Sequence, residues 1–494
     1  MFDFRSFIDF WQYNPASPLL FTSKGFLLLF AAFLVIFNLL KKNFNARVLY
    51  VTVFSVYFYY LSSGLYFWLL IFMSVSDFSL GFFISRKRRG IQKKLLLALS
   101  LVIDLGLLSY FKYTNFFLEL LHPLFSSEPF TARNIFLPVG VSFFTFQSLS
   151  YVIDIYRGRL EPTQKWIDYL FYLSFFPQLV AGPIVRAKDF IPQIYRKPFP
   201  TGRMFNYGLI LILIGLCKKI MVSDYISVNY VDRVFDNPLL YSGFENLMAI
   251  YGYAIQIYCD FSGYSDIAIG LALLLGFRFP ENFHLPYQAA SITDFWHRWH
   301  ISLSTWLKDY LYISLGGNRK GKFRMYLNLL ITMLLGGLWH GAAIRFIIWG
   351  GLHGLALCLH KLAMSIFPGM KVCGEDMTPW RRFLSTLVTF NFVCFCWIFF
   401  RAGDMQTVHD MLHQVGTSMQ WEMVPTFIAS YWKVFLIILT AYVMHFIPFT
   451  SHENMKQAVF RLPIAIKILL SVAVIYIAML FQGGDVQPFI YFQF

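Results

Sequence analysis

Histidines flanked by tryptophans lie between positions 294 and 340, inside a chain that is otherwise mostly apolar. This stretch opens with Asp294-Phe-Trp-His-Arg-Trp-His300 and closes with the apolar run Asn328-Leu-Leu-Ile-Thr-Met-Leu-Leu-Gly-Gly-Leu-Trp-His340. A run of this composition is typical of a helix that enters a membrane, and it would carry His340 with it. An ionisable side chain at membrane depth is costly and usually has a functional reason to be there. The histidines of this stretch are therefore the first candidates for chemistry.

The rest of the chain has the composition of a membrane protein. Of its 494 residues, 57% are hydrophobic, 20% aromatic and only 14% charged, whereas soluble domains carry roughly 25% charged residues. Apolar runs of spanning length recur between Gly25 and Leu480, and only helices satisfy the backbone there. We predict an all-α polytopic bundle of about 11–13 spanning helices, with re-entrant or interfacial helices around a central tunnel, as one domain over residues 1–494.

The basic residues mark topology. The net charge of +15 comes from short loops between apolar runs, so it indicates membrane orientation and excludes a nucleic-acid-binding module. The basic loop Lys41–Arg47 should face the cytoplasm, which places the N-terminus outside a multi-pass inner (plasma) membrane protein, and the strongest inside marker is the segment Ser85–Lys94. Among the predicted spans are residues 24–40, 205–222, 246–258, 263–279, 325–340, 343–363, 384–400, 430–448 and 464–481.

Three segments contain polar or helix-breaking residues between or within apolar runs. The segment Pro138–Gln147 contains hydroxyls and a glutamine that need protein neighbours, so its helix should be internal to the bundle. Prolines from Pro177 onward predict a re-entrant or interfacial element up to Arg203. Gly263 lies between the spans predicted at 246–258 and 263–279, where it would mark a tight turn unless the surrounding polar cluster has a functional role.

His340 is the principal candidate for a catalytic base, because imidazole exchanges a proton near neutral pH. Gly336, Gly337 and Gly341 would leave room beside it for a substrate. The alternative is a histidine that only hydrogen-bonds between helices.

The neighbouring motif offers a second histidine, His300. His297 and His300 are three residues apart and would share a helix face. Trp296 and Trp299 at the same spacing are typical of interfacial anchors. Asp294 is the expected N-cap of the helix.

Two further polar positions are open to more than one interpretation. Asp260 lies in Asp260-Phe-Ser-Gly-Tyr-Ser-Asp266 and would either orient a histidine or a sugar hydroxyl, or belong to a turn. His353 is a candidate partner of His340, or a packing histidine. We predict no metal site, since the chain lacks His-Glu-x-x-His and a cysteine cluster near the histidines.

Taken in order, several motifs resemble those of the membrane-bound O-acyltransferase family, in the bacterial branch of alginate O-acetylation and teichoic-acid D-alanylation. The resemblance covers nearly the whole chain. The motifs are Pro138–Gln147, Gln178–Ile184, Asp260–Asp266, Asp294–Ser304, Gly316–Arg319, Leu338–Gly341 and Tyr491–Phe494.

The resemblance implies roles for particular residues. His340 would be catalytic and His300 the second site residue, at a position that eukaryotic relatives often fill with asparagine. Residues that would position donor or acceptor are Asp260, Trp299, Trp339, His353 and Asn318. The terminal motif and the Gly-Gly-Asn-Arg turn are closer to the alginate branch, so acetyl is the expected acyl group.

The resulting hypothesis is transfer of an acetyl group from a cytoplasmic thioester to a hydroxyl outside, for O-acetylation of an exported or cell-envelope polysaccharide. The donor would be acetyl-coenzyme A or an acyl carrier protein thioester, bound as substrate with no resident cofactor. The basic segment Lys308–Arg324 would attract this acidic donor. A periplasmic partner of the serine-esterase type would receive the acetyl group first.

Two alternatives remain. A transporter or flippase of a polar glycan or lipid-linked group would also have polar residues and broken helices within its spans, although paired inverted halves are not visible. An acyltransferase acting on a protein or lipid would use the same histidines with a longer acyl chain.

Overall fold

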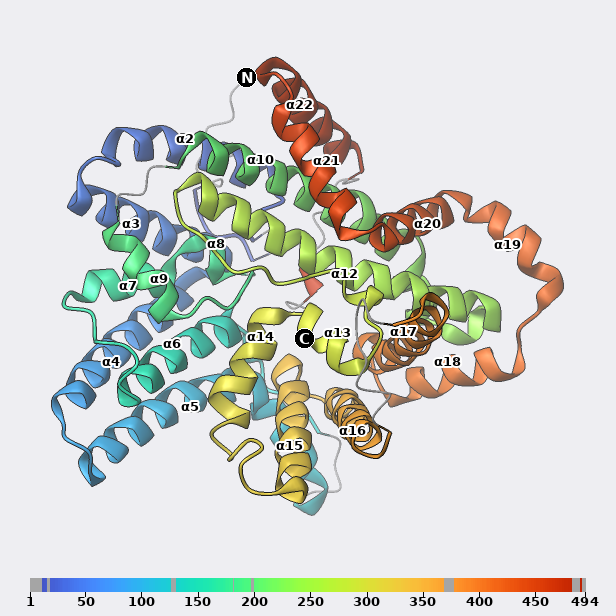
Figure 1. Ribbon diagram of the computed structural model, residues 1–494, viewed down its shortest axis with the longest axis horizontal. Helices are drawn as coiled ribbons and strands as arrows, with labels where there is room; N and C mark the ends of the chain where they lie inside the picture. Colours follow the sequence, from blue (N-terminus) through green and yellow to red (C-terminus); the bar gives the residue numbers. More distant parts are fainter. Residues whose placement is uncertain are drawn as a thin grey trace. The chain divides into compact units, whose positions relative to one another are not determined.

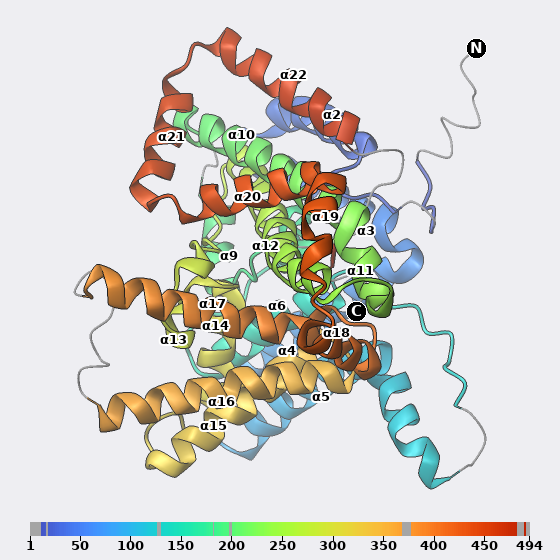
Figure 2. The ribbon, with the colours of Figure 1, turned by 90° about the vertical axis from the view of Figure 1, so that its right-hand side faces the viewer.

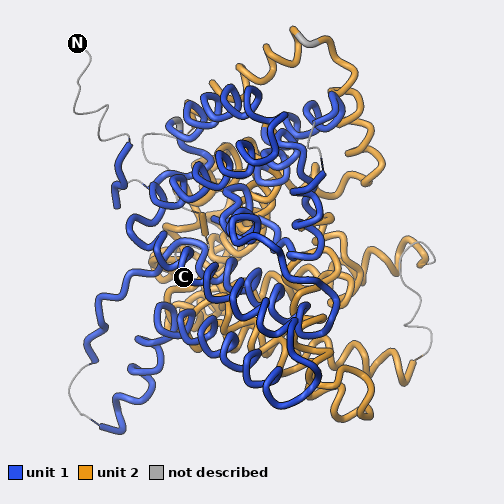
Figure 3. Tube along the Cα trace, turned by 90° about the vertical axis from the view of Figure 1, so that its left-hand side faces the viewer, with its two compact units in different colours: residues 1–212, 267–280 blue, residues 213–266, 281–494 orange. Residues whose placement is uncertain are grey.

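The computed structural model shows a helical protein. It describes residues 11–15, 18–125, 130–180, 182–196, 200–367, 377–481 and 489–490. All regular secondary structure in these ranges is helical (Figure 1), which confirms the predicted all-α class. The chain forms two compact units, residues 1–212 with 267–280 and residues 213–266 with 281–494 (Figure 3). A single domain over residues 1–494 stays a prediction.

The first unit contains the N-terminal helices. They are α2 (Lys24–Leu40), α3 (Phe44–Ser63), α4 (Phe67–Arg86), α5 (Ile91–Leu121), α6 (Val141–Tyr156), α7 (Trp166–Ser174), α8 (Phe176–Leu179), α9 (Ala187–Tyr195) and most of α10 (Gly202–Leu216).

The second unit contains the elements around the histidine motifs. They are the π-helical segments Cys217–Asp224, Ser227–Val231 and Leu307–Tyr312, and helices α11 (Asp232–Asp236), α13 (Ile292–Arg298), α14 (Ile301–Trp306), α15 (Lys322–His340), α16 (Ile344–Ile366), α17 (Pro379–Arg401), α18 (Met405–Thr417), α19 (Val424–Ser430), α20 (Trp432–Phe446), α21 (Phe449–Arg461) and α22 (Ile464–Phe481). Helix α12 (Gly243–Leu274) begins in this unit and ends in the first.

Helix α6 is internal to the first unit, as its polar residues predict. Thr145, Gln147 and Ser148 are all fully buried. Ser148 donates a hydrogen bond to Asp77 and lies 2.9 Å from the Tyr169 hydroxyl. Protein groups therefore replace water for the Ser148 hydroxyl, whereas the side-chain polar atoms of Thr145 and Gln147 have no hydrogen-bond partner among the described residues.

The proline-rich segment from Pro177 contains the short helices α8, which is buried, and α9, which is partly buried. Gln178 is fully buried and donates to the carbonyl of Tyr172. Helix α9 contains Pro192 and buries Phe190 and Ile194. The helix breaks expected from the prolines are present, and a re-entrant or interfacial location of this segment stays a prediction.

The turn predicted at Gly263 is wrong, because α12 is continuous from Gly243 to Leu274. A Cβ atom on Gly263 would lie 2.8 Å from the carbonyl oxygen of Gly215. Glycine is needed here because another helix approaches closely, and the backbone does not turn.

Long apolar helices with lipid-facing sides identify a multi-pass membrane protein. Val102 on α5, Val388 on α17 and Leu469 on α22 are 68%, 70% and 69% exposed, which suits contact with lipid. Within the described residues, five helical segments are long and apolar enough to cross a membrane: Phe44–Arg86, Ile91–Leu124, Gly243–Leu274, Ile344–Ile366 and Pro379–Arg401. Two bent pairs, α19 with α20 and α21 with α22, raise the number to seven.

Several other predicted spans form helices that are shorter than a full crossing. Helix α2 has 17 residues and α6 has 16, against about 20 for a bilayer. Helix α10 is different, because it continues through the π-helical segments and α11 to Asp236 without a break. The outside location of the N-terminus stays a prediction, and residues 1–10, 482–488 and 491–494 lie outside the described part of the chain.

Helices α15, α16 and α17 run side by side (Figure 2), and glycines bring the first two into backbone contact. A Cβ atom on Gly337 would lie 2.2 Å from the carbonyl oxygen of Phe346, and one on Gly350 would lie 2.3 Å from that of Met333. Gly341 faces the Phe346 ring, with a Cβ contact of 2.0 Å. The space beside Gly337 and Gly341 is therefore filled by protein, which corrects the prediction that it admits substrate.

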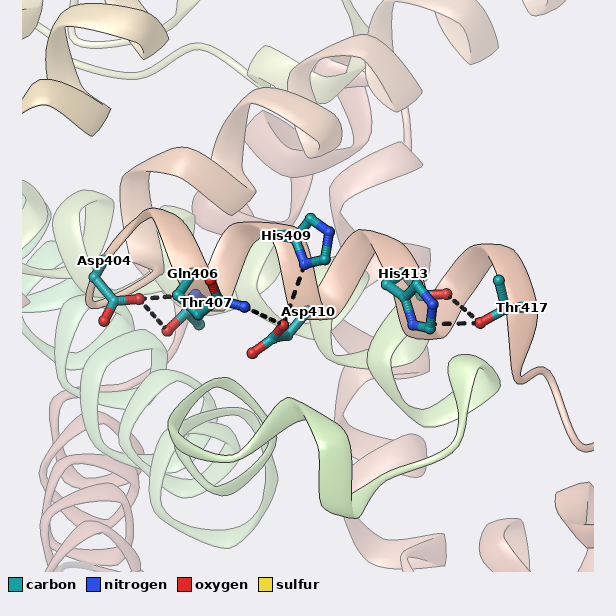
Figure 4. Close-up of polar contacts among 7 residues, drawn as sticks. All are labelled: Asp404, Gln406, Thr407, His409, Asp410, His413 and Thr417. Atoms are coloured by element: carbon teal, nitrogen blue, oxygen red, sulfur yellow. Dashed lines mark hydrogen bonds and ion pairs between the residues drawn. The ribbon is translucent and has the colours of Figure 1, made fainter.

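Helix α18 begins with a capped turn (Figure 4). The Asp404 carboxylate accepts hydrogen bonds from the backbone N–H of Thr407 at 2.7 Å and from its hydroxyl at 2.8 Å. The backbone hydrogen bond, followed by the hydroxyl bond, lowers the pKa of Asp404. His409 and His413, one turn apart, lie on the exposed side of this helix.

The glycine contact between α15 and α16 is testable. Gly337→Ala should destabilise the protein by about 1–3 kcal/mol, because the added methyl group overlaps a backbone oxygen that cannot rotate away. The measurement is thermal unfolding of purified protein in detergent. Gly106→Ala on α5 is the matched control, because nothing lies within 4 Å of its added Cβ. Equal stability of the two variants would contradict the close contact.

Candidate active site

His340 is the last residue of α15 and is 2% exposed. Its ring contacts three aromatic rings edge to face, with centroid distances of 5.0 Å to Trp339, 5.0 Å to Trp349 and 5.4 Å to Phe400. An imidazole in such a surrounding is shielded from water, so that its interactions with a bound substrate are strengthened.

His300 is fully buried and lies in the short break between α13 and α14. Its backbone is left-handed, with φ 43° and ψ 53°. This conformation is easily adopted by glycine and sometimes by asparagine or aspartate, and it costs free energy for most other residues. The Phe261 ring lies edge-on to the imidazole at 4.5 Å. Strained backbone of this kind is typical of functional sites.

Trp339 brings the two histidines into one site. The centroid of its ring is 6.2 Å from that of His300 and 5.0 Å from that of His340. Trp339 is 4% exposed. His300, Trp339 and His340, which the sequence analysis selects as site residues, thus lie together in the structure.

Asn282 holds the break at His300 in place. The first N–H groups of a helix have no partner within the helix. The N–H of Ile301 donates to the backbone oxygen of Asn282 at 2.9 Å, and that of Ser302 donates to its side-chain oxygen at 3.2 Å. Asn282 therefore caps α14 from a distant part of the chain.

The same side-chain oxygen of Asn282 faces the Nδ1 atom of His300 at 3.2 Å. It also accepts from the Ser302 hydroxyl at 2.8 Å. On the other side, the Asn282 amide nitrogen donates to the Ser265 hydroxyl at 3.1 Å. Both ends of the amide are used, so the orientation of the side chain is defined.

Burial lowers the pKa of the His300 imidazole to about 3. The ring is therefore neutral at physiological pH and is able to accept a hydrogen bond at one nitrogen while donating from the other.

His353 and Trp299 belong to the same aromatic surroundings. The Trp349 ring is 5.0 Å from His340 and 4.8 Å from His353. His353 is fully buried, and neither of its ring nitrogens has a hydrogen-bond partner among the described residues. Trp299, 1% exposed, packs 4.9 Å from Trp397.

Asp260 belongs to an ion-pair network. Its Oδ1 atom is 2.6 Å from the ammonium of Lys219, which also pairs with Asp224 at 2.7 Å. Its Oδ2 atom accepts from the N–H of Ile490 at 2.9 Å. Both carboxylate oxygens thus have structural partners. Asp260 neighbours the histidines through the adjacent Phe261, whose ring contacts His300.

Asn318 lies away from this cluster, in the exposed turn between the π-helical segment and α15, where it accepts a hydrogen bond from the Tyr312 hydroxyl. Gly317 in this turn has φ 53° and Gly316 has φ 112°, which explains the glycine pair in the motif.

Three local predictions about the histidine motif are wrong. His297 and His300 do not share a helix face, because α13 ends at Arg298. The N-cap of α13 is Ser291, and Asp294 instead pairs with Arg298 at 2.8 Å.

The third concerns the tryptophans at positions 296 and 299, which were expected to anchor at a membrane interface. They are 9% and 1% exposed. They are buried because other aromatic rings of the second unit cover them, with Trp349 at 5.8 Å from Trp296.

The sequence reasoning missed Asn282 and Lys219. Lys219 had a usable signal, since a lysine inside an apolar run needs a carboxylate partner. Asn282 lies in an irregular segment 18 residues before His300, and no spacing rule connects the two positions.

The long apolar helices and the buried histidines place the chain among helical membrane proteins with polar groups in their interior, and comparison with known proteins identifies the family. The sequence model of MBOAT, the membrane-bound O-acyltransferase family, matches residues 56–401. The chain is 38% identical over 414 residues to the probable alginate O-acetylase AlgI of Pseudomonas aeruginosa, covering 82% of this chain and 76% of that protein.

Two other relatives have related activities. The peptidoglycan O-acetyltransferase of Helicobacter pylori is 36% identical over 400 residues, covering 75% of this chain and 74% of that protein. The teichoic acid D-alanyltransferase of Bacillus subtilis is 28% identical over 311 residues, covering 58% of this chain and 77% of that protein. The chain belongs to the membrane-bound O-acyltransferase family and is an O-acyltransferase.

The buried state of His300 predicts a pH dependence of stability. Between about pH 6.5 and pH 3 the unfolded chain binds a proton at this position and the native protein does not, so stability falls as the pH falls. From pH 7 to pH 5, the wild type should lose about 2 kcal/mol more than His300→Asn. Asparagine tolerates the left-handed backbone.

The measurement is denaturant unfolding in detergent at both pH values. His409→Asn is the control, because the His409 side chain is 71% exposed, and it should lose as much stability as the wild type. If His300→Asn does so too, His300 is not buried in its neutral form.

Proposed function

We propose that this protein transfers an acetyl group to a hydroxyl acceptor outside the membrane, for O-acetylation of an exported or cell-envelope polysaccharide. The observation that carries the proposal is the placement of the His300 and His340 rings beside Trp339 in a member of an O-acyltransferase family. Acetyl is favoured over D-alanyl because the O-acetyltransferase relatives are 38% and 36% identical and the D-alanyltransferase is 28% identical.

His340 is the general base in the proposed reaction. The acceptor oxygen attacks the thioester carbonyl carbon while its proton passes to the imidazole of His340. The new C–O ester bond forms, the C–S bond breaks, and His340 returns the proton to the departing thiolate. Such base catalysis contributes typically ~10²–10⁴-fold to the rate.

The aromatic rings around His340 support this role. Trp339, Trp349 and Phe400 exclude water from the imidazole, which limits hydrolysis of the thioester in place of transfer. They also carry no group that would hold the imidazole permanently protonated.

The donor in this proposal is a cytoplasmic thioester, either acetyl-coenzyme A or an acetylated acyl carrier protein, and both are acidic. Arg319, Lys320, Lys322 and Arg324 are exposed around the turn before α15, where they would attract such a donor. The protein lies in the inner membrane with its N-terminus outside. A periplasmic serine-esterase-type partner would pass the acetyl group to the polysaccharide.

The central test is the acetate content of cell-envelope polysaccharide in a strain that lacks the gene. Wild-type protein should restore alkali-labile acetate, and His340→Ala should not, because no base would remain for the hydroxyl. His409→Ala is the matched control and should restore it fully, since this histidine is exposed on α18. Equal membrane levels of the three proteins are checked by immunoblot.

Restoration by His340→Ala would show that His340 is structural. If no protein restores acetate, the acyl group or the acceptor is different, and mass spectrometry of the envelope polymers would identify the modification.

The basic turn has its own test. Arg319→Glu with Lys320→Glu should weaken binding of radiolabelled acetyl-coenzyme A to the purified protein about tenfold at low salt. The effect should be smaller at high salt, because dissolved ions screen the attraction between the donor and the basic turn. Lys433→Glu, an exposed charge reversal on α20, should leave binding unchanged. Unchanged binding in the double variant would exclude this turn as the donor-attracting surface.

A further inference from the structure

The hydrogen bonds of Asn282 determine which nitrogen of His300 carries a proton. The backbone N–H of Ser302 is only a donor, and it points at the Asn282 side chain at 3.2 Å. The atom that it meets must therefore be the amide oxygen, because the amide nitrogen is itself a donor. The amide nitrogen then faces the Ser265 hydroxyl at 3.1 Å, which is able to accept.

The Nδ1 atom of His300 faces this same oxygen at 3.2 Å. An oxygen with no hydrogen offers only lone pairs, so Nδ1 must donate and must carry the proton. A neutral imidazole has one N–H, and Nε2 is therefore the nitrogen with the lone pair. Burial keeps the ring neutral, as described above.

We propose that Asn282 is a positioning residue that fixes His300 as the Nδ1–H tautomer, so that His300 meets the hydroxyl acceptor as a hydrogen-bond acceptor and does not polarise the thioester carbonyl. A carbonyl or a developing oxyanion requires a donor, and Nε2 has no hydrogen to give. This inference rests on the proposed function and assigns one of its two substrates to His300.

The assignment has a consequence for the kind of acceptor. The attacking hydroxyl has one hydrogen, which goes to His340. The Nε2 atom of His300 is then able to accept from a second hydroxyl beside the attacking one. A sugar ring with neighbouring hydroxyls supplies this pair, and so does a partner protein that presents two hydroxyl side chains together.

The burial and rigidity of the Asn282 contacts make the tautomer a fixed property of the site. Asn282 is 1% exposed, Ser265 is 2% and Ser302 is 5%. Asn282 also anchors the backbone of Ile301 through its own carbonyl oxygen. A ring flip of His300 would put a carbon atom against the amide oxygen and lose the hydrogen bond at Nδ1.

The first measurement needs no substrate. Purified protein with ¹⁵N-labelled histidine in detergent is examined by NMR, and the His300 signals are identified as those lost in His300→Asn. We expect a protonated Nδ1 and an unprotonated Nε2 in the wild type. Asn282→Asp, which keeps an oxygen toward Nδ1, should retain this pattern, and Asn282→Ala should lose it.

The second measurement is polysaccharide acetate in cells. Asn282→Ala should reduce acetate about 10–100-fold, the usual effect of removing a group that orients a functional histidine, and Asn282→Asp should stay within a few-fold of the wild type. Asn246→Ala is the matched control. Asn246 is a fully buried asparagine of the same unit, bonded to the carbonyls of Pro238, Tyr241 and Ser242, and its loss should leave acetate near the wild-type level.

Three results would overturn the inference: a protonated Nε2 on His300 in the wild type, equal acetate for Asn282→Ala and Asn246→Ala, or a loss with Asn282→Asp as large as with Asn282→Ala. If the tautomer is as expected but the wild-type protein yields no acetate ester, the proposed function fails while the assignment of the tautomer stands.

Discussion

Every backbone N–H removed from water must find an acceptor within the protein, and the site depends on how this requirement is met between α13 and α14. The chain stops being helical at Trp299, turns through a left-handed residue and starts a new helix at Ile301. The new helix has unpaired N–H groups at its start, and Asn282 accepts two of them. Without this cap the break would expose donors in a place where water has little access.

This arrangement joins structure to chemistry. The oxygen that caps the helix also faces His300, so one amide stabilises the backbone and orients the imidazole. His340 is positioned differently, by the close glycine contact of α15 with α16. Trp339 links the two positions, because its ring contacts both imidazoles.

The positions of most long helices could be predicted from the sequence. The first predicted span, residues 24–40, coincides with α2, and α15 and α16 begin and end within three residues of the predicted spans. Apolar run length carries this information directly. The turn predicted at Gly263 was wrong because a sequence alone does not distinguish a glycine in a turn from a glycine at a close helix contact. The nearby carbonyl oxygen of Gly215 shows that Gly263 is at a helix contact. For the site, His300 and His340 could be selected as candidates from costly polar residues in apolar surroundings. The end of α13 and the role of Asn282 could not, because they depend on contacts between distant positions.

The left-handed backbone at His300 also limits how this position could change during evolution. Most side chains would be strained there, and glycine would remove the functional group altogether. Asparagine combines tolerance of this backbone with a carbonyl oxygen that accepts a hydrogen bond. The resemblance to the wider family implies asparagine at this position in eukaryotic relatives. Histidine and asparagine could therefore replace each other at position 300 during evolution without a destabilised intermediate. The left-handed backbone restricts which residues position 300 tolerates, and the chemistry of the site selects only among those residues.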